Sequence, residues 1–257
     1  MICKISIIIP ALNEEENIVQ AIENVETALK EINEPGEIIV INDGSSDNTS
    51  KLVLDKIRNN SCIRIINHEV TKGIGASVWH GIMESKGEII TWMPGDAEND
   101  AFETLRYHTL MDDVDIVIPF IYNKEVRTKT RRILSKMYKG IINLSFGMLL
   151  NYMNGAAMFR KSILRDYNLQ NTGFFFQTEL LIKSIKKGYL YAEVPCALKK
   201  REKGHSKAIS IMSLYKVISG YFMVLVSVYF KDSRNKDIQH DSLTYSRRLR
   251  NYNEQQY

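Results

Sequence analysis

Three carboxylates follow an apolar segment of strand length in the first half of the chain. The segment spans residues 87–93 and ends at a Pro-Gly pair, and the carboxylates are those of Asp96, Glu98 and Asp100. Ligands of an open α/β sheet bind beyond the carboxyl ends of its strands. Asp96 and Glu98 could therefore hold one Mg²⁺ or Mn²⁺, which prefer oxygen ligands. The alternative is a solvated acidic turn that opens a helix at Asp100, where negative charge favours the helix dipole.

The composition is that of one large globular domain, or of one domain with an appendage. The chain has 257 residues, of which 44% are hydrophobic and 25% charged, and this suffices for a full core. The formal net charge is only +4, but basic residues concentrate at 124–139, at 183–207 and after Phe230. This distribution favours a phosphate-bearing ligand or an anionic membrane surface. No nucleic-acid-binding motif is present, so we expect no nucleic-acid partner.

Cysteine usage and targeting signals predict a cytoplasmic protein. The three cysteines are odd in number and lack metal-ligand spacing, so we expect buried thiols. The first residues lead directly into a strand-like segment, so we expect no signal peptide. No apolar run reaches the length of about 18 residues that a membrane-spanning helix needs.

Strand and helix patterns alternate along the first half of the chain. Apolar, β-branched segments predict strands at 4–10, 37–41, 62–66, 87–93 and 114–119. Most segments between them carry apolar residues at helical spacing. Strict alternation predicts a parallel sheet with helices on both faces. Three polar turns, 13–17, 42–48 and 96–100, would then lie on one rim of that sheet.

Five stretches of the chain resemble those of the family-2 glycosyltransferases. They occur in order across roughly residues 4–210, at 7–15, 39–49, 73–77, 95–98 and 201–207. More narrowly, the chain is similar to dolichol- and polyprenyl-phosphate sugar synthases and their bacterial relatives. The resemblance implies the GT-A fold, a Rossmann-like α/β fold with a mostly parallel sheet and helices on both faces. It also implies an enzyme, a hexosyltransferase that uses nucleotide-diphosphate sugars.

The resemblance implies a nucleotide site at the ends of the first two strands. Pro10, Asn13 and Glu15 would line this site, and Asp43 would accept a hydrogen bond from the base. The donor set implied by the resemblance also includes Gly73, Gly95 and Arg132. Asp43 could instead be a turn or cap residue, and Asn13 could do no more than cap the first helix.

Asp96 and Glu98 match the metal-binding part of the family's Asp-x-Asp signature. A Mg²⁺ or Mn²⁺ ion there would bridge the diphosphate and stabilise charge on the leaving nucleotide, which makes Asp96 a catalytic candidate as well. The signature is incomplete, because Pro94 stands at its first Asp and Asn42 stands where another Asp is usual. A metal-independent enzyme is the alternative.

The acceptor side also departs from the family pattern. Asn151 stands at the place of the usual candidate for a catalytic carboxylate, and an amide cannot act as a base near pH 7. A lipid phosphate is already anionic and needs no base, so the substitution favours a polyprenyl phosphate acceptor. One alternative is a saccharide hydroxyl acceptor in cell-surface polysaccharide synthesis, served by another base. The other is a nucleotide-sugar-binding protein without turnover.

Three further residues are catalytic candidates through the resemblance. Glu179, near the start of a helix, would face the acceptor or the sugar. Arg201 and Lys207 would flank a lid loop that closes over the diphosphate. The alternatives are a glutamate on a helix surface and a basic surface loop.

The second half of the chain contains two segments suited to a membrane surface. Residues 123–147 predict an amphipathic basic helix, which would either face the membrane or pack on the core with a solvated basic face. The uncharged segment 217–230 is too short for a span and suits an interfacial or buried helix. We therefore expect a GT-A domain at 1–208, a membrane-interface or packing helix at 209–231, and a disordered polar tail at 232–257.

These expectations combine into one predicted activity. The protein would pass a sugar from a nucleotide-diphosphate sugar to a polyprenyl phosphate, with inversion of the anomeric centre by direct displacement. It would be cytoplasmic and peripheral at the inner face of the membrane. Its partners would be the sugar donor, the lipid phosphate and the membrane surface.

Overall fold

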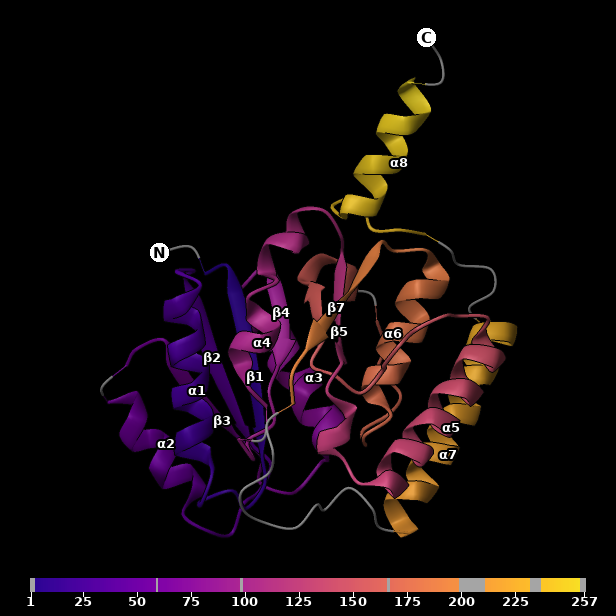
Figure 1. Ribbon diagram of the computed structural model, residues 1–257. Helices are drawn as coiled ribbons and strands as arrows, with labels where there is room; N and C mark the ends of the chain where they lie inside the picture. Colours follow the sequence, from indigo (N-terminus) through magenta and orange to yellow (C-terminus); the bar gives the residue numbers. More distant parts are fainter. Residues whose placement is uncertain are drawn as a thin grey trace.

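A seven-stranded sheet with helices on both faces forms the centre of the molecule (Figure 1). The computed structural model describes residues 3–58, 60–97, 99–165, 167–198, 211–231 and 237–254. In sheet order the strands are β3 (Ile63–Asn67), β2 (Gly36–Asn42), β1 (Ile5–Ala11), β4 (Ile89–Trp92), β6 (Met158–Arg160), β5 (Ile116–Ile121) and β7 (Tyr191–Cys196). The α-helices are α1 (Ile18–Glu31), α2 (Thr49–Ile57), α3 (Ile74–Glu84), α4 (Ala101–Leu105), α5 (Lys129–Phe146), α6 (Phe176–Lys187), α7 (Ile211–Val226) and α8 (Leu243–Glu254). This arrangement confirms the predicted, mostly parallel α/β sheet.

Strand β6 is the exception to the parallel arrangement. It runs antiparallel to both neighbours, with Phe159 opposite Ile90 of β4 and Ile116 of β5. The pairs β1–β2, β1–β4, β2–β3 and β5–β7 are parallel. After α5 the chain enters β6 from the rim at which β4 ends, where Thr91 Oγ1 donates to Ala157 O (3.2 Å). The strict strand–helix alternation therefore stops after β5, and β6 is the antiparallel strand of a mostly parallel sheet.

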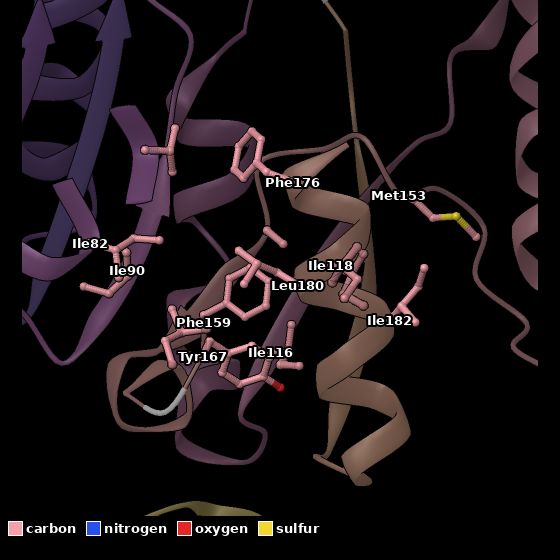
Figure 2. Packing of buried hydrophobic residues seen from close by; sticks show 14 of the residues in the cluster. Ile82, Ile90, Ile116, Ile118, Met153, Phe159, Tyr167, Phe176, Leu180 and Ile182 are labelled. Atoms are coloured by element: carbon pink, nitrogen blue, oxygen red, sulfur yellow. The ribbon is translucent and has the colours of Figure 1, made fainter. Parts of the chain in front are cut away.

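Alternate residues of the central strand β1 pack on opposite faces of the sheet. Ile7 and Ile9 are fully buried in the cluster that includes α1, α2 and α4. Ile8 belongs to the second cluster, which includes residues of α3 and α6. Figure 2 shows part of this second cluster, with Leu180 of α6 and Phe159 of β6. Burial on both faces therefore favours polar groups at the strand ends.

Helices α5 and α7 lie side by side at one flank of the molecule (Figure 1). Ser145 Oγ and Tyr221 Oη are 2.8 Å apart, and the ring of Phe146 stacks on that of Tyr229 with centroids 6.1 Å apart. Tyr229 lies in η4 (Ser227–Lys231), a short π-helix that continues α7. The exposed side of α7 carries apolar side chains, among them Leu214, Ile218 and Phe222. Among the described residues, no helix combines the length and the apolar character needed to cross a membrane.

The polar tail, expected to be disordered, contains helix α8. The buried carboxylate of Asp115, which precedes β5, accepts hydrogen bonds from Leu243 N and Thr244 N, each at 2.9 Å. Thr244 Oγ1 in turn accepts from Leu190 N at 2.8 Å. An acceptor at a helix start satisfies backbone NH groups that have no partner within the helix. The capping residue lies 128 positions upstream of Leu243, which is why composition alone did not reveal the helix.

Candidate active site

The turns after β1 and β2 are hydrogen-bonded to each other at the carboxyl ends of these strands. Asn13 N donates to Ser45 Oγ (2.9 Å), and Asn13 Oδ1 accepts from Ser46 N (2.8 Å). Glu15 Oε2 accepts from the backbone N and from Nδ2 of Asn48 (3.0 and 2.9 Å). The two turns therefore form one rim, and the expected donor residues Asn13 and Glu15 shape it with their side chains.

Asn13 is not the cap of α1, contrary to the expectation from its position. The helix begins at Ile18, and its N-cap residue Asn17 makes no side-chain capping bond. Asn13 instead adopts a φ of +53°, a left-handed conformation that asparagine tolerates better than most residues. Its amide is directed to the neighbouring turn in this conformation.

Asp43 lies where β2 ends and is almost completely buried, with 3% of its surface exposed. Its Oδ1 accepts from Lys72 N (2.9 Å) and lies 2.7 Å from His68 Nδ1, and its Oδ2 accepts from Gly73 N (2.8 Å). Burial raises the pKa of Asp43, but these hydrogen bonds outweigh burial and hold the pKa below its ordinary value. A carboxylate offers about four acceptor positions, and these three donors occupy three of them in Asp43.

Two stacked histidines connect Asp43 to the surface of α3. His68, which follows β3, is 6% exposed, and its Nε2 lies 2.9 Å from Nδ1 of His80. The two ring planes are nearly parallel, with an angle of 6° between them, and the ring centroids are 5.2 Å apart. A carboxylate only accepts, so His68 Nδ1 carries a proton, and with both rings neutral His80 Nδ1 donates to His68 Nε2. The chain of three side chains orients the Asp43 carboxylate.

Pro10 and Gly95, both expected at the donor, are in contact across the ends of β1 and β4. Gly95 N donates to Pro10 O (3.3 Å), and a Cβ atom on Gly95 would lie 3.1 Å from that oxygen. Half-buried Asp96 follows immediately. Asp100 is the N-cap of α4, where its carboxylate accepts from Phe102 N at 3.1 Å. Of the described residues of the acidic stretch, Asp100 is a helix cap and Asp96 lies beside the rim.

A divalent cation at this rim would have few protein ligands. The described residues contain no cluster of three or more His, Cys, Asp or Glu side chains that could hold a metal ion. Asp96 is described, whereas the second predicted ligand, Glu98, lies outside the described residues. Mg²⁺ commonly binds one or two carboxylates and takes its other oxygens from substrate phosphates and water. The residues present therefore fit a cation that arrives with a diphosphate.

Glu179 does not lie on a helix surface, and its carboxylate accepts hydrogen bonds from other groups of the protein. The residue is fully buried. Its Oε1 accepts from Gln170 N (3.1 Å) and from Lys183 Nζ (2.7 Å), and its Oε2 accepts from Asn171 N (3.0 Å). A buried carboxylate needs this degree of compensation. The expectation that Glu179 faces the acceptor or the sugar is therefore wrong, and its role is to hold the loop before α6.

Asn151 is bound to a glutamate of β7. Asn151 N donates to Glu193 Oε1 (2.6 Å), and Asn151 Nδ2 donates to Glu193 Oε2 (3.0 Å). The segment that follows Asn151 runs to the rim at the end of β4, where β6 begins. A carboxylate therefore lies beside Asn151, although the position itself carries an amide.

Of the remaining predicted residues, only Arg132 lies in the described part of the chain. Arg132 is exposed on the first turn of α5, at the opposite flank of the molecule from α1 and α2 (Figure 1). Arg201 and Lys207 lie outside the described residues. Their assignment to the donor stays a prediction.

Comparison with known protein families identifies the family of the chain. The family described as "Glycosyl transferase family 2" matches residues 6–168. The chain belongs to glycosyl transferase family 2. The matched region contains β1 to β6 and with them the rim around Asp43 and Asp96.

Three curated family relatives share about a quarter of their residues with this chain. A dolichol-phosphate mannosyltransferase from Pyrococcus furiosus is 26% identical over 212 residues, which cover 79% of this chain and 59% of that protein. An undecaprenyl-phosphate 4-deoxy-4-formamido-L-arabinose transferase from Proteus mirabilis is 29% identical over 147 residues, covering 56% of this chain and 44% of that protein. A dolichyl-phosphate beta-glucosyltransferase from Trichomonas vaginalis is 27% identical over 246 residues, covering 87% and 71%. The chain thus spans less than two thirds of the first two relatives.

Solved structures confirm the GT-A fold of this family-2 chain. Glucosyl-3-phosphoglycerate synthase from Mycobacterium tuberculosis in complex with UDP has a TM-score of 0.66 at 20% identity, covering 88% of this chain and 80% of that chain. The same enzyme with Mn²⁺, UDP-glucose and phosphoglyceric acid has a TM-score of 0.64 at 19% identity, covering 88% and 79%.

Several residues of this family-2 site were not found by sequence reasoning. His68 directly follows β3, as Asp43 directly follows β2, so the rule that ligand-facing groups follow strand ends would have identified it. Glu193 lies within a strand and 42 positions from Asn151, and no pattern in the sequence joins the two. Sequence periodicity finds the rim but not the side chains brought to it by tertiary contacts.

Proposed function

We propose that this chain transfers a sugar from a nucleotide-diphosphate sugar to a polyprenyl phosphate, as a peripheral protein at the cytosolic face of a membrane. A lipid phosphate oxygen forms the new bond to the anomeric carbon while the bond from that carbon to the diphosphate breaks, so the centre inverts. The names of the three relatives, all transferases of dolichyl or undecaprenyl phosphate, support this acceptor class.

The observation that carries the proposal is an extensive set of exposed apolar side chains on α5, on α7 and on the residues shortly after each helix. We call it the α5–α7 face, and its exposed members are Ile133, Leu134, Met137, Ile141, Leu144, Leu149, Leu214, Tyr215, Ile218, Phe222, Met223, Val226, Tyr229 and Phe230. Leu144 and Leu149 are each 88% exposed. Soluble monomers rarely expose apolar surface of this extent. The same helices carry exposed Lys136 and Lys216, which suit anionic headgroups.

The donor is assigned to the rim around Asp43. Its carboxylate would accept from the base, and the Pro10–Gly95 contact brings Asp96 to the same edge of the sheet. Asp96 and Glu98 would hold a Mg²⁺ or Mn²⁺ ion that stabilises charge on the departing nucleoside diphosphate. Arg201 and Lys207 are proposed to contact the diphosphate from the segment between β7 and α7.

The acceptor assignment is supported by the absence of a carboxylate at position 151. A phosphate monoester is largely ionised at neutral pH and attacks without a base. The α5–α7 face would keep the chain where such an acceptor lies within reach. We place the catalytic domain at 1–208 and the membrane-contacting helix at 209–231.

One observation favours a second candidate, transfer to a saccharide hydroxyl. Such an acceptor needs a general base, and the Glu193 carboxylate lies beside Asn151, oriented by two hydrogen bonds from it. In this reaction Glu193 would take the proton of the attacking hydroxyl. The two candidates therefore differ in whether Glu193 is required.

A transfer assay with two acceptor classes tests the proposal. The full chain is incubated with labelled UDP- and GDP-sugars, Mg²⁺, and either vesicles containing polyprenyl phosphate or soluble oligosaccharides. We expect label in the lipid phosphate, and less than about a twofold change in the Glu193→Gln variant. Label only in the oligosaccharide, lost by about a hundredfold in Glu193→Gln, would establish the second candidate instead, since a general base contributes that much or more.

A further inference from the structure

The loop formed by residues 168–173 lies between the donor rim and α7. On one side, Thr172 O accepts a hydrogen bond from Gly75 N (2.8 Å) at the start of α3. On the other side, Asn171 Oδ1 lies against Gly220 of α7. Asn171 is 5% exposed although its neighbours Gln170 and Thr172 are exposed. The loop therefore inserts one buried side chain between two helices.

Glu179 fixes this loop from behind. Besides its bonds to the backbone of Gln170 and Asn171, its Oε2 accepts from Asn171 Nδ2 at 2.5 Å. Lys183 Nζ, one helical turn along α6, compensates the buried charge at 2.7 Å. Because the Asn171 amide is tied at its nitrogen, its oxygen cannot rotate away from α7 without breaking a charged hydrogen bond.

There is no room for a side chain where the loop meets α3. A Cβ atom on Gly75 would lie 2.5 Å from Asn171 O, and one on Gly73 would lie 2.6 Å from Thr172 O. Gly73 also has a φ of +100°, which favours glycine. Gly73 N is a donor to Asp43, so the position of the loop sets the position of the groups that hold the Asp43 carboxylate.

The contact with α7 is equally close. A Cβ atom on Gly220 would lie 2.1 Å from Asn171 Oδ1 and 3.1 Å from Phe175 Cβ. In contrast, a Cβ atom on Gly140 of α5 would meet nothing within 4 Å. Gly140 therefore provides a matched control for a glycine-to-alanine change in a helix of the same face.

We infer that Asn171 and Glu179 are positioning residues for the sugar donor and that α7, through Gly220, holds them in place. The inference rests on the proposed donor site at Asp43. A displacement of α7 would move Asn171, then the Thr172–Gly75 contact, and then the Gly73 amide that binds Asp43. Donor affinity would thus depend on a helix that contributes no atom to the rim contacts described for Asp43.

Calorimetric titration of UDP and GDP with Mg²⁺ tests this inference on the full chain. Gly220→Ala is expected to raise the dissociation constant about tenfold, which corresponds to about 1.4 kcal/mol, whereas Gly140→Ala should change it by less than about twofold. Alanine favours a helix over glycine, so a loss of affinity in Gly220→Ala cannot be assigned to weakened helix formation. If Gly220→Ala does not fold, Glu179→Gln tests the same contact from the other side and is expected to weaken binding similarly.

A double variant tests whether positions 171 and 220 act through one contact. Asn171→Ala removes both the positioning amide and the oxygen that an alanine at position 220 would meet, so the double variant Asn171→Ala/Gly220→Ala is expected to bind as weakly as Asn171→Ala alone, without a further loss. Wild-type affinity in both Gly220→Ala and Glu179→Gln would overturn the inference and leave the donor site intact. A wild-type chain that binds neither nucleotide would instead remove the donor site on which the inference rests.

Discussion

At the scale of single residues, Asp43 depends on donors from two places in the chain. His68 follows β3, and Lys72 and Gly73 precede α3. Their hydrogen bonds hold the carboxylate ionised in a nearly dry position, where removal of its charge leaves backbone NH groups without an anionic partner. The same carboxylate faces the rim that would receive the donor, so stability and binding are linked at this residue.

The Asp43→Asn variant is expected to lose both properties. The NH₂ group of the asparagine would replace one carboxylate oxygen and face a donor that now has no acceptor, which lowers the unfolding free energy by about 1–3 kcal/mol. The dissociation constant of UDP or GDP should rise at least about tenfold. Urea unfolding and calorimetric titration measure the two effects. Asp55→Asn provides a control, because Asp55 is 50% exposed and pairs with Arg58 on the surface, where such pairs contribute little.

The loss of folding stability in acid should depend on the same carboxylate. The pKa of Asp43 is lowered in the folded state, so its contribution to stability is complete above its unfolded-state pKa of about 4. It is then lost as the pH falls through the folded-state value. Asp43→Asn should therefore show a shallower loss of stability below about pH 4 than the wild type, whereas equal slopes would argue against this account of the carboxylate.

His80 is expected to govern stability at a higher pH. Burial lowers the pKa of His80, as do the nearby His68 and Lys72, and these effects exceed the opposite effect of Glu84. The unfolded chain therefore binds a proton first, and stability falls as the pH drops from about 6.5 towards the folded-state pKa. His80→Asn, which keeps a donor near Nδ1, should remove that slope. Urea unfolding at pH 7.5 and 5.5 provides the measurement, and an unchanged slope in the variant would contradict the assignment.

At the scale of elements, the α5–α7 face predicts binding to membranes. Leu144→Asp combined with Leu149→Asp should weaken binding to vesicles of anionic phospholipid by at least about tenfold, because each buried leucine contributes about 1.5–3 kcal/mol. Nucleotide affinity should not change. Leu54→Asp on α2, where Leu54 is 47% exposed, is the control in a vesicle sedimentation assay. Equal sedimentation of all three proteins would show that this face does not bind the membrane.

Helix α8 is expected to depend on a single buried carboxylate. Asp115→Asn weakens the acceptor for Leu243 N and Thr244 N and should cost about 1–3 kcal/mol, with faster hydrogen exchange across α8. The neighbouring Asp113→Asn removes only an exposed ion pair with Arg247 and should leave exchange almost unchanged. Similar exchange in the two variants would mean that other contacts hold the helix.

At the scale of the whole molecule, the sequence pattern predicted those strands and helices that local interactions determine. The apolar strands β1 to β5 and the helices between β1 and β4 followed from periodicity, and the polar rim followed from the direction of the strands. The antiparallel direction of β6 and the helix in the tail did not, because each is fixed by contacts with distant segments. For α8, this distant contact is the hydrogen bond from Leu243 N to Asp115.

The same division applies to the candidate site. Asp43, Pro10 and Gly95 were expected at the rim and lie there, since strand ends bring them together. Asn13 and Glu15 also lie there, but their side chains join two turns. Glu179 was assigned to the wrong surroundings, because its burial beneath the loop at 168–173 depends on tertiary packing that a helical pattern does not report.

The central claim is that one rim, between the ends of β1, β2 and β4, binds a nucleotide-diphosphate sugar. A thermal-shift panel of UDP-, GDP- and TDP-sugars, each with Mg²⁺, Mn²⁺ or EDTA, tests it most directly, because a ligand that binds only the folded state raises the unfolding midpoint. The account predicts a metal-dependent rise with one nucleotide class, reduced in Asp96→Ala and abolished in Asp43→Asn. A folded wild-type chain whose midpoint does not move with any of these donors would contradict it.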